Sequence, residues 1–190
     1  PAIDMPQGAG ARRSERLRSS LFTVEVHSGN REAKTALGSG YLVSTDGRVA
    51  TNYHVVGRYV EEPERYSIRV RSGPATLPAR LLGFDLVNDL AILEVAGAAG
   101  PPLPLSTRPP AHGSSIVAFG NPEGLGLSLV TGVMNGLAEH GIVDRMLLSM
   151  PLNSGMSGGP ILDDRDEVVG TSVSTMWGSD SLSFGVPVAR

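Results

Sequence analysis

The chain has 190 residues, a formal net charge of −3 and no cysteine. Within this chain a thiol nucleophile, a disulfide and a thiolate metal site are therefore excluded, and the scattered charges favour neither nucleic acid nor an anionic membrane as a partner. Apolar residues make up 41% of the chain. They include no run of the roughly 18 residues that a membrane span needs, so we expect a folded core and no membrane insertion.

The first 19 residues carry four arginines, Arg12, Arg13, Arg16 and Arg18, and lack the apolar pattern of a strand. Two interpretations are open for this segment, a docking arm and a solvated tail. Because chain termini are usually mobile unless something holds them, we expect residues 1–19 to form a flexible N-terminal tail.

Apolar and polar residues alternate with a period of two after residue 20, as is typical of strands. The alternating segments are LFTVEVHS, the pair of strands within AKTALGSGYLVSTDGRVATNYHVV, and then YSIRVRS, ATLPARLLGF and DLAILEVA. A Thr45-Asp46-Gly47 turn joins the two paired strands, and HVVGRYVEEPER has room for one short turn of helix after His54. These segments predict an N-terminal β-barrel over residues 20–96.

A proline-rich stretch interrupts this pattern, and we interpret residues 97–113 as an inter-barrel linker. Strands resume with SIVAFG, LSLVTGVMNGL, RMLLSM, GPILD, EVVGTSVST and LSFGVPV. They predict a C-terminal β-barrel over residues 114–190. The expected fold is all-β, with two six-stranded antiparallel barrels and an active site in the cleft between them.

Three residues in this pattern suit acyl transfer, which needs a nucleophile, a base and a carboxylate that orients the base. His54 ends a strongly patterned strand, Asp89 directly precedes the apolar strand LAIL, and Ser157 lies in the glycine-rich stretch SGMSGGP. Each residue alone has an ordinary structural explanation as a strand end or a turn. Their joint occurrence across both halves favours a catalytic interpretation.

Two other aspartates are weighed against Asp89 as the orienting carboxylate. Asp85 is more typical of the turn before Asp89, and Asp46 lies at a hairpin tip, so Asp89 is favoured. The glycines beside Ser157 allow a tight turn that aims the Gly155 and Ser157 amides into one concavity, which is the form of an oxyanion hole.

The motifs GSGYLVSTDGRVATNYHVV, NDLAIL, AFGNPEGLGLSLVTGVMNGL, NSGMSGGPILDDRDEVVG and SFGVPV follow one another in this order. With them the chain resembles a chymotrypsin-fold, trypsin-like serine protease of the HtrA/Deg type, over the catalytic domain without a PDZ domain. The resemblance implies a serine endopeptidase with His54 as general base, Asp89 as its orienter and Ser157 as nucleophile. It also implies that the Gly155 and Ser157 amides are the oxyanion donors.

The resemblance carries further expectations about partners. The enzyme should act on protein or peptide substrates without a metal or an organic cofactor. Homo-oligomers, often trimers, and an extracytoplasmic location, periplasmic or secreted, are common in the family. A different class stays open, namely a protease-fold binding or scaffolding protein with an inactive or latent cleft.

The resemblance also places the primary specificity pocket. Its floor should lie at Pro151 and Leu152, and its facing wall at Val173, Ser174 and Thr175. Since no carboxylate stands at the floor, we expect cleavage after small or medium apolar residues.

One residue departs from the family pattern. Met156 occupies the position at which digestive relatives carry an acidic residue that pairs with a new N-terminus. A thioether cannot make that ion pair, so apolar packing should hold the oxyanion turn, and activity should not depend on a new N-terminus.

Overall fold

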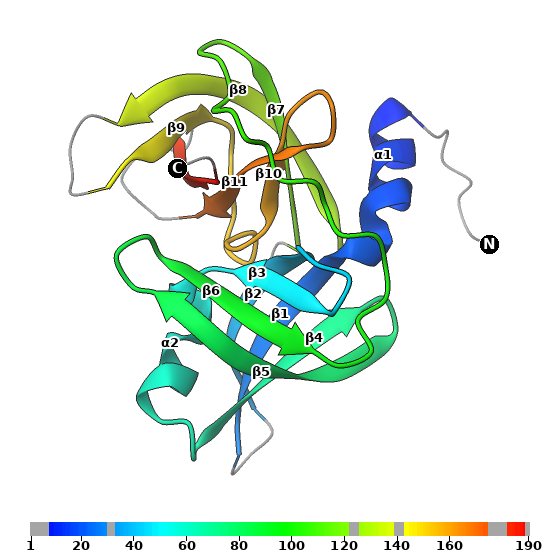
Figure 1. Cartoon of the computed structure of the whole chain (residues 1–190), viewed down its shortest axis with the longest axis vertical. Coiled ribbons are helices and arrows are strands. Elements are labelled where there is room, and N and C mark those ends of the chain that lie inside the picture. Colours follow the sequence, from blue (N-terminus) through cyan, green and yellow to red (C-terminus); the bar gives the residue numbers. More distant parts are fainter. Residues whose placement is uncertain (1–7, 30–32, 122–125, 139–142, 175–181, 189–190) are drawn as a thin grey trace.

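The computed structural model describes residues 8–29, 33–121, 126–138, 143–174 and 182–188. Its strands form two closed six-stranded antiparallel barrels, one above the other in Figure 1. The all-β, two-barrel architecture predicted from the sequence is therefore confirmed.

The first barrel spans residues 21–95 and has the spatial strand order β1-β2-β3-β6-β5-β4. Its strands are β1 (Leu21–Ser28), β2 (Lys34–Leu42), β3 (Arg48–Thr51), β4 (Tyr66–Ser72), β5 (Ala75–Asp85) and β6 (Leu90–Val95). Helix α2 (Tyr53–Glu61) lies between β3 and β4 and is longer than the single turn expected after His54. Its residues Val55 and Val56 are buried against the core of this barrel.

The second barrel spans residues 115–187 and has the order β10-β11-β12-β9-β8-β7. Its strands are β7 (Ser115–Gly120), β8 (Ser128–Ala138), β9 (Arg145–Ser149), β10 (Pro160–Leu162), β11 (Val168–Val173) and β12 (Ser183–Pro187). Every residue of β11 is buried, because this strand faces the barrel core on one side and the first barrel on the other.

Apolar side chains form one cluster inside each barrel and a third cluster between the barrels. The cluster between them joins Tyr41 of β2 to Phe119, Leu162 and Val168 of the second barrel. Across the same interface, the Tyr41 hydroxyl lies 2.9 Å from Oγ1 of Thr171. Burial raises the pKa of Tyr41 to about 12. This packed interface fixes how the two barrels meet and so positions any site between them.

The proline-rich connection between the barrels is tied to both of them. The Leu103 amide donates a hydrogen bond to the Leu42 carbonyl at 2.9 Å, and the Ser106 amide donates to the Val168 carbonyl at 2.9 Å. Prolines have no N–H to donate to the hydrogen-bond ladder of a sheet, so these separate main-chain hydrogen bonds hold the connection in place instead.

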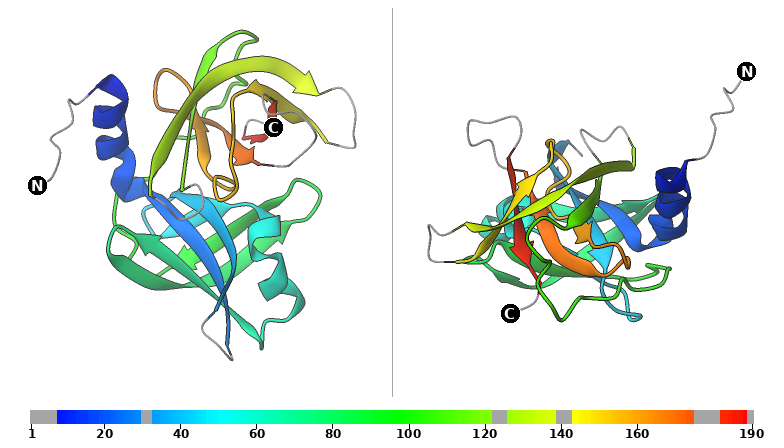
Figure 2. Two further views of the ribbon diagram at one scale, coloured as in Figure 1. Left: turned by 180° about the vertical axis from the view of Figure 1, so that it is seen from behind. Right: turned by 90° about the horizontal axis from the view of Figure 1, so that it is seen from above.

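The structure differs from the flexible tail expected for residues 1–19. Ala9–Leu17 form helix α1, followed by a 3₁₀ turn over Arg18–Ser20, and Figure 2 shows α1 lying beside the second barrel. Leu17 is buried in the cluster between the barrels, and both Arg13 and Arg16 form ion pairs with Asp166. The arginines therefore hold this segment against the second barrel, as expected of a docking arm and not of a solvated tail. Residues 1–7 lie outside the described part of the chain.

No described helix combines the length and the apolar character that crossing a membrane requires.

Candidate active site

His54 and Asp89 both belong to the first barrel, His54 in α2 and Asp89 in the turn before β6. Nδ1 of His54 lies 2.7 Å from Oδ2 of Asp89, and the His54 backbone amide donates to Oδ1 of the same carboxylate at 2.9 Å. His54 is the second residue of α2, where a helix leaves backbone N–H groups without partners. One carboxylate thus caps the start of the helix and also binds Nδ1 of the imidazole. The orientation of the ring is fixed through that nitrogen.

Asp89 has a left-handed backbone conformation, with φ of 58°. This region is unfavourable for residues with a Cβ, and such conformations gather at functional sites. The Asn52 side chain holds the turn by donating from Nδ2 to the Asp89 carbonyl at 2.8 Å. Asp85 binds the Asn88 amide at 3.0 Å instead, and Asp46 pairs with Arg48 on another loop. Of the three aspartates, Asp89 alone contacts His54 within the described residues.

Ser157 lies across the interface, on the loop between β9 and β10, and is 3% exposed. Its carbonyl accepts a hydrogen bond from the Ser39 amide of β2 at 2.7 Å. A Cβ added to the next residue, Gly158, would lie 3.0 Å from the Asn52 nitrogen and 2.4 Å from Oγ1 of Thr51. The glycine therefore lets the Ser157 loop approach the segment that leads into His54.

The Ser157 hydroxyl is directed at Ser174 rather than at His54. Its Oγ lies 2.6 Å from Oγ of Ser174 and accepts a hydrogen bond from the Ser174 amide at 3.0 Å. Among the described residues, Ser157 Oγ has no hydrogen bond to His54. A rotation of the Ser157 side chain about its Cα–Cβ bond is therefore needed before His54 can accept its proton.

The turn before Ser157 has the geometry that presents amides to a ligand. Met156 donates its amide to the Asn153 carbonyl at 3.0 Å, and Gly155 between them has φ of 89°. A four-residue turn with positive φ at its third position is a type II turn, which glycine adopts without strain. The amides of Gly155 and Ser157 have no hydrogen-bond partner within the part of the chain described here.

Met156 is completely buried and belongs to the apolar cluster inside the second barrel, together with Met150 and Ile161. A Cβ added to Gly120 would lie 2.8 Å from the Met156 Cα, so β7 passes directly against this residue. The apolar packing predicted for Met156 is confirmed.

The residues expected to form the specificity pocket are only partly described. Pro151 is exposed, Leu152 and Ser174 are partly buried, and Val173 is buried. Thr175 lies outside the described residues, so the pocket stays a prediction.

The remaining histidines lie in other surroundings where they are described. His27 pairs with Glu25 on β1 at 3.0 Å, and His112 is on an exposed turn of the inter-barrel connection. His140 lies outside the described residues. Across the described ranges, no group of three or more His, Asp or Glu side chains is placed to hold a metal ion.

Three residues with close contacts to this site were not selected from the sequence for those contacts. Asn52 binds the Asp89 carbonyl, Ser174 binds Ser157, and Ser39 binds the carbonyls of both Ser157 and Gly155. The only signal for Ser39 in the sequence is a polar residue between two glycines inside an apolar strand. Gly155 and Ser157 are more than a hundred residues away in the chain, so the sequence alone does not connect them with Ser39.

Comparison with known proteins places this geometry in a family. Residues 38–170 match the family model described as a trypsin-like peptidase domain. A probable periplasmic serine endoprotease, DegP-like, of Ectopseudomonas mendocina is 34% identical over 166 residues, which are 83% of this chain and 34% of that protein. The putative serine protease HhoA of Synechocystis is 31% identical over 162 residues, 80% of this chain and 40% of that protein.

Solved structures show the same fold. The serine endoprotease from Yersinia pestis has a TM-score of 0.80 at 26% identity. The match covers 98% of this chain and 64% of that one. The active form of the Rv3671c protease from M. tuberculosis has a TM-score of 0.81 at 21% identity, with 99% of this chain and 88% of that one covered.

The chain spans 34% to 40% of the length of the two curated relatives described above. The family match nevertheless extends over well more than half of the chain and includes His54, Asp89 and Ser157. In sequence and fold the chain is similar to serine proteases of the HtrA/DegP type, and it belongs to the trypsin-like peptidase domain family.

Proposed function

We propose that the chain is a serine endopeptidase that cleaves peptide bonds through an acyl-enzyme on Ser157, with His54 as general base and Asp89 as its orienting carboxylate. The observation that carries this proposal is the double contact of Asp89 with the ring and the backbone of His54, at 2.7 and 2.9 Å. A surface ion pair would need only one of these contacts. Together they leave Nε2 as the ring nitrogen that is available for proton transfer.

The reaction begins when the Ser157 hydroxyl leaves Ser174 and turns toward His54. As Oγ bonds to the scissile carbonyl carbon, its proton passes to Nε2 of His54, and the carbonyl π electrons move to the oxygen. His54 then gives this proton to the leaving amine as the C–N bond breaks. A water molecule, deprotonated by the same nitrogen, hydrolyses the ester and restores Ser157.

The Gly155 and Ser157 amides are proposed to bind the oxyanion that forms in each half of the reaction. Their lack of partners among the described residues and the positive φ of Gly155 support this role. A preorganised donor of this kind contributes roughly 3 to 4 kcal/mol to the transition state.

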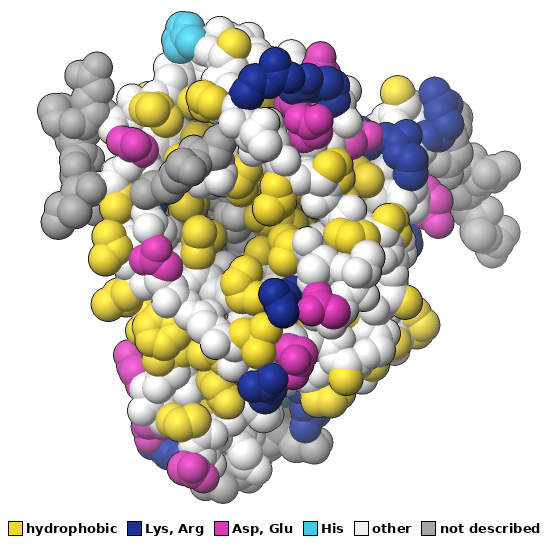
Figure 3. Space-filling view, in the orientation of Figure 1, with side chains coloured by type: hydrophobic (Ala, Val, Ile, Leu, Met, Phe, Trp, Pro, Cys, Tyr) yellow, Lys and Arg dark blue, Asp and Glu magenta, His cyan; other side chains and the backbone are white. Residues whose placement is uncertain are grey.

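Cleavage after small or medium apolar residues is proposed for specificity. A lysine or arginine side chain would find no carboxylate at Pro151 or Leu152 and would lose its hydration. Exposed apolar residues on the β5–β6 hairpin that carries Asp89 support binding of apolar chain segments: Leu82, Phe84, Leu86 and Val87. Figure 3 shows apolar side chains spread over the face of the molecule that bears the β5–β6 hairpin.

Two further proposals rest on the relatives and on the family resemblance, and the geometry of the site does not bear on them. A DegP-like relative is described as periplasmic and another relative as chloroplastic, which supports an extracytoplasmic location. Assembly into trimers is proposed from the resemblance, and sedimentation of the purified chain tests it.

A binding or scaffolding protein with a latent cleft is the second candidate. The contact of Ser157 with Ser174 is the observation on its side, because it holds the hydroxyl away from His54.

One digestion separates these proposals. A denatured protein mixture is incubated with the wild type and with Ser157→Ala, and the new termini are sequenced. We expect cuts after Val, Ala or Leu with the wild type and none with the variant. Cuts mainly after Lys or Arg would contradict the specificity, and an absence of cuts from folded wild-type protein would favour the scaffold.

A further inference from the structure

Ser39 lies in the middle of β2, behind the turn that carries Gly155 and Ser157. Its Oγ donates a hydrogen bond to the Gly155 carbonyl at 2.7 Å and accepts one from the Asn121 amide at 3.0 Å. Ser39 is 1% exposed. Its hydroxyl therefore has both a donor role and an acceptor role filled inside the protein.

The backbone of Ser39 holds the other side of the same turn. Its amide donates to the Ser157 carbonyl at 2.7 Å, and its carbonyl accepts from Oγ1 of Thr51 at 2.7 Å. One residue of the first barrel thus binds the carbonyls of Gly155 and Ser157. These are the two residues whose amides are the proposed oxyanion donors.

Glycine makes such an anchor necessary. Gly155 has φ of 89° and no Cβ, so its own sterics permit several orientations of the peptides on either side of it. The Gly155 carbonyl and the Met156 amide belong to one peptide plane, which is fixed at one end by Ser39 Oγ and at the other by the Asn153 carbonyl. The direction of the next amide, that of Ser157, depends on this plane.

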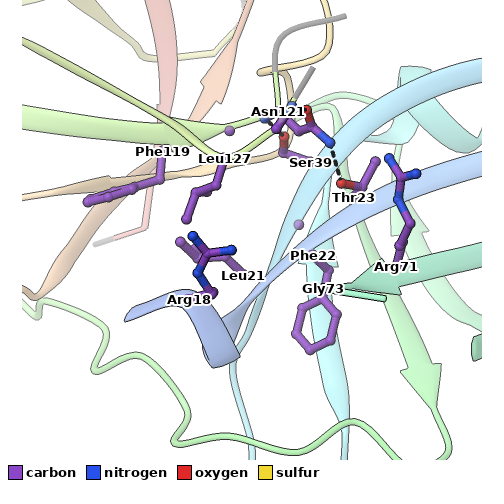
Figure 4. A pocket seen from close by; sticks show the side chains of 13 residues that line it. Arg18, Leu21, Phe22, Thr23, Ser39, Arg71, Gly73, Phe119, Asn121 and Leu127 are labelled. Carbon is purple, nitrogen blue, oxygen red and sulfur yellow. Dashed lines mark hydrogen bonds between the residues drawn. The ribbon is translucent and has the colours of Figure 1, made fainter. Parts of the chain in front are cut away.

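The anchor is itself braced by the segment after β7. The Asn121 side chain donates to Oγ1 of Thr23 at 2.7 Å, drawn as a dashed line in Figure 4, and accepts from the Gly126 amide at 2.6 Å. Ser39, Asn121 and Thr23 line one wall of a cavity of about 280 Å³ beside these bonds. Ser39 is therefore held from both barrels.

We propose that Ser39 is a positioning residue for the oxyanion hole: its hydroxyl fixes the Gly155–Met156 peptide so that the Gly155 and Ser157 amides point at the same oxygen. This inference rests on the proposed function. Donors must lie about 2.7 to 3.1 Å from the position that the oxyanion takes, so a turn that drifts loses rate before it loses substrate binding.

The test compares two buried serines that make the same kind of bond. Ser20 is 0% exposed, and its Oγ donates at 2.6 Å to the carbonyl of Pro101, on the connection between the barrels. Ser39→Ala removes the hydroxyl partner of the Gly155 carbonyl and of the Asn121 amide, and Ser20→Ala removes that of the Pro101 carbonyl. Both variants should therefore have a lower unfolding temperature, Ser39→Ala more so. We measure kcat, KM and the affinity for a peptidyl boronate, which forms a tetrahedral adduct on the nucleophile.

We expect Ser39→Ala to lose about tenfold to a hundredfold in kcat and in boronate affinity, with KM within about twofold of the wild type. Ser20→Ala should keep the wild-type kcat and boronate affinity. Ser39→Cys keeps a weak donor and should give intermediate values; it also serves if the alanine variant fails to fold.

Equal kcat values for Ser39→Ala and Ser20→Ala, or for Ser39→Cys and the wild type, would overturn the positioning role while leaving an active wild type intact. A wild type that neither turns over peptide nor binds the boronate would overturn the proposed function, and the inference with it.

Discussion

The carboxylate of Asp89 binds His54 twice, with Oδ2 at 2.7 Å from Nδ1 and Oδ1 at 2.9 Å from the backbone nitrogen. Asp89→Asn keeps the shape of the side chain but can present an N–H to Nδ1, which would put the imidazole proton on the wrong nitrogen. We expect kcat to fall by about 10⁴-fold. Peptide turnover measures this loss in protein whose thermal unfolding shows it to be folded.

Asp85→Asn is the matched control, because Asp85 lies four residues away and its carboxylate binds Asn88. Its kcat should stay close to that of the wild type. If the two variants lost activity equally, the assignment of the orienting carboxylate would be wrong.

The hydroxyl of Ser174 competes with His54 for Ser157, at an Oγ–Oγ distance of 2.6 Å. Ser174→Ala removes this contact and leaves the backbone hydrogen bond from residue 174 in place. Since one such bond is worth about 1 kcal/mol, the rate of labelling of Ser157 by a fluorophosphonate should rise by about fivefold. A rate that stays the same or falls would mean that Ser174 does not restrain the nucleophile.

Met156 holds its loop by packing, since it is completely buried among apolar residues. Met156→Leu conserves side-chain volume, so a fluorophosphonate should label Ser157 in this variant at close to the wild-type rate. Met156→Asn buries an amide without partners, and we expect a loss of about 1 to 3 kcal/mol in the free energy of unfolding. Urea denaturation of both variants measures this difference, and equal stability of the two would contradict the packing role.

Tyr41 should lower the free energy of unfolding at alkaline pH, because burial raises the pKa of its phenol from 10.0 to about 12. The unfolded chain loses the phenol proton from about pH 10 upward, while the folded protein keeps it until about pH 12. Tyr41 therefore contributes its full stability below pH 10, and this contribution is lost as the pH rises through that interval.

Tyr41→Phe removes this titration and the bond to Thr171. It should be less stable than the wild type near pH 7, by about 1 kcal/mol, and should lose less stability between pH 10 and pH 11. Unfolding in urea at several pH values tests both parts. Parallel pH curves for the two proteins would show that Tyr41 does not ionise on unfolding.

The two barrels could be predicted because local patterns mark their strands, a period of two in some and a short apolar run in others. Asp89 could be predicted because it directly precedes one of those strands. Helix α1 could not, because the partner of Arg13 is 153 residues away in the chain. Ser39 has the same difficulty, with 116 residues between it and Gly155. Such contacts depend on how the barrels meet, and alternation within a strand carries no information about that.

The measurement that tests the central claim most directly is fluorophosphonate labelling of the intact chain, followed by mass spectrometry of its peptides. We expect one adduct, on Ser157, which is absent in Ser157→Ala, strongly slowed in His54→Ala and unchanged in rate in His112→Ala. An unlabelled but folded wild type, or a His54→Ala variant labelled as fast as the wild type, would contradict the assignment of Ser157 and His54 as nucleophile and base.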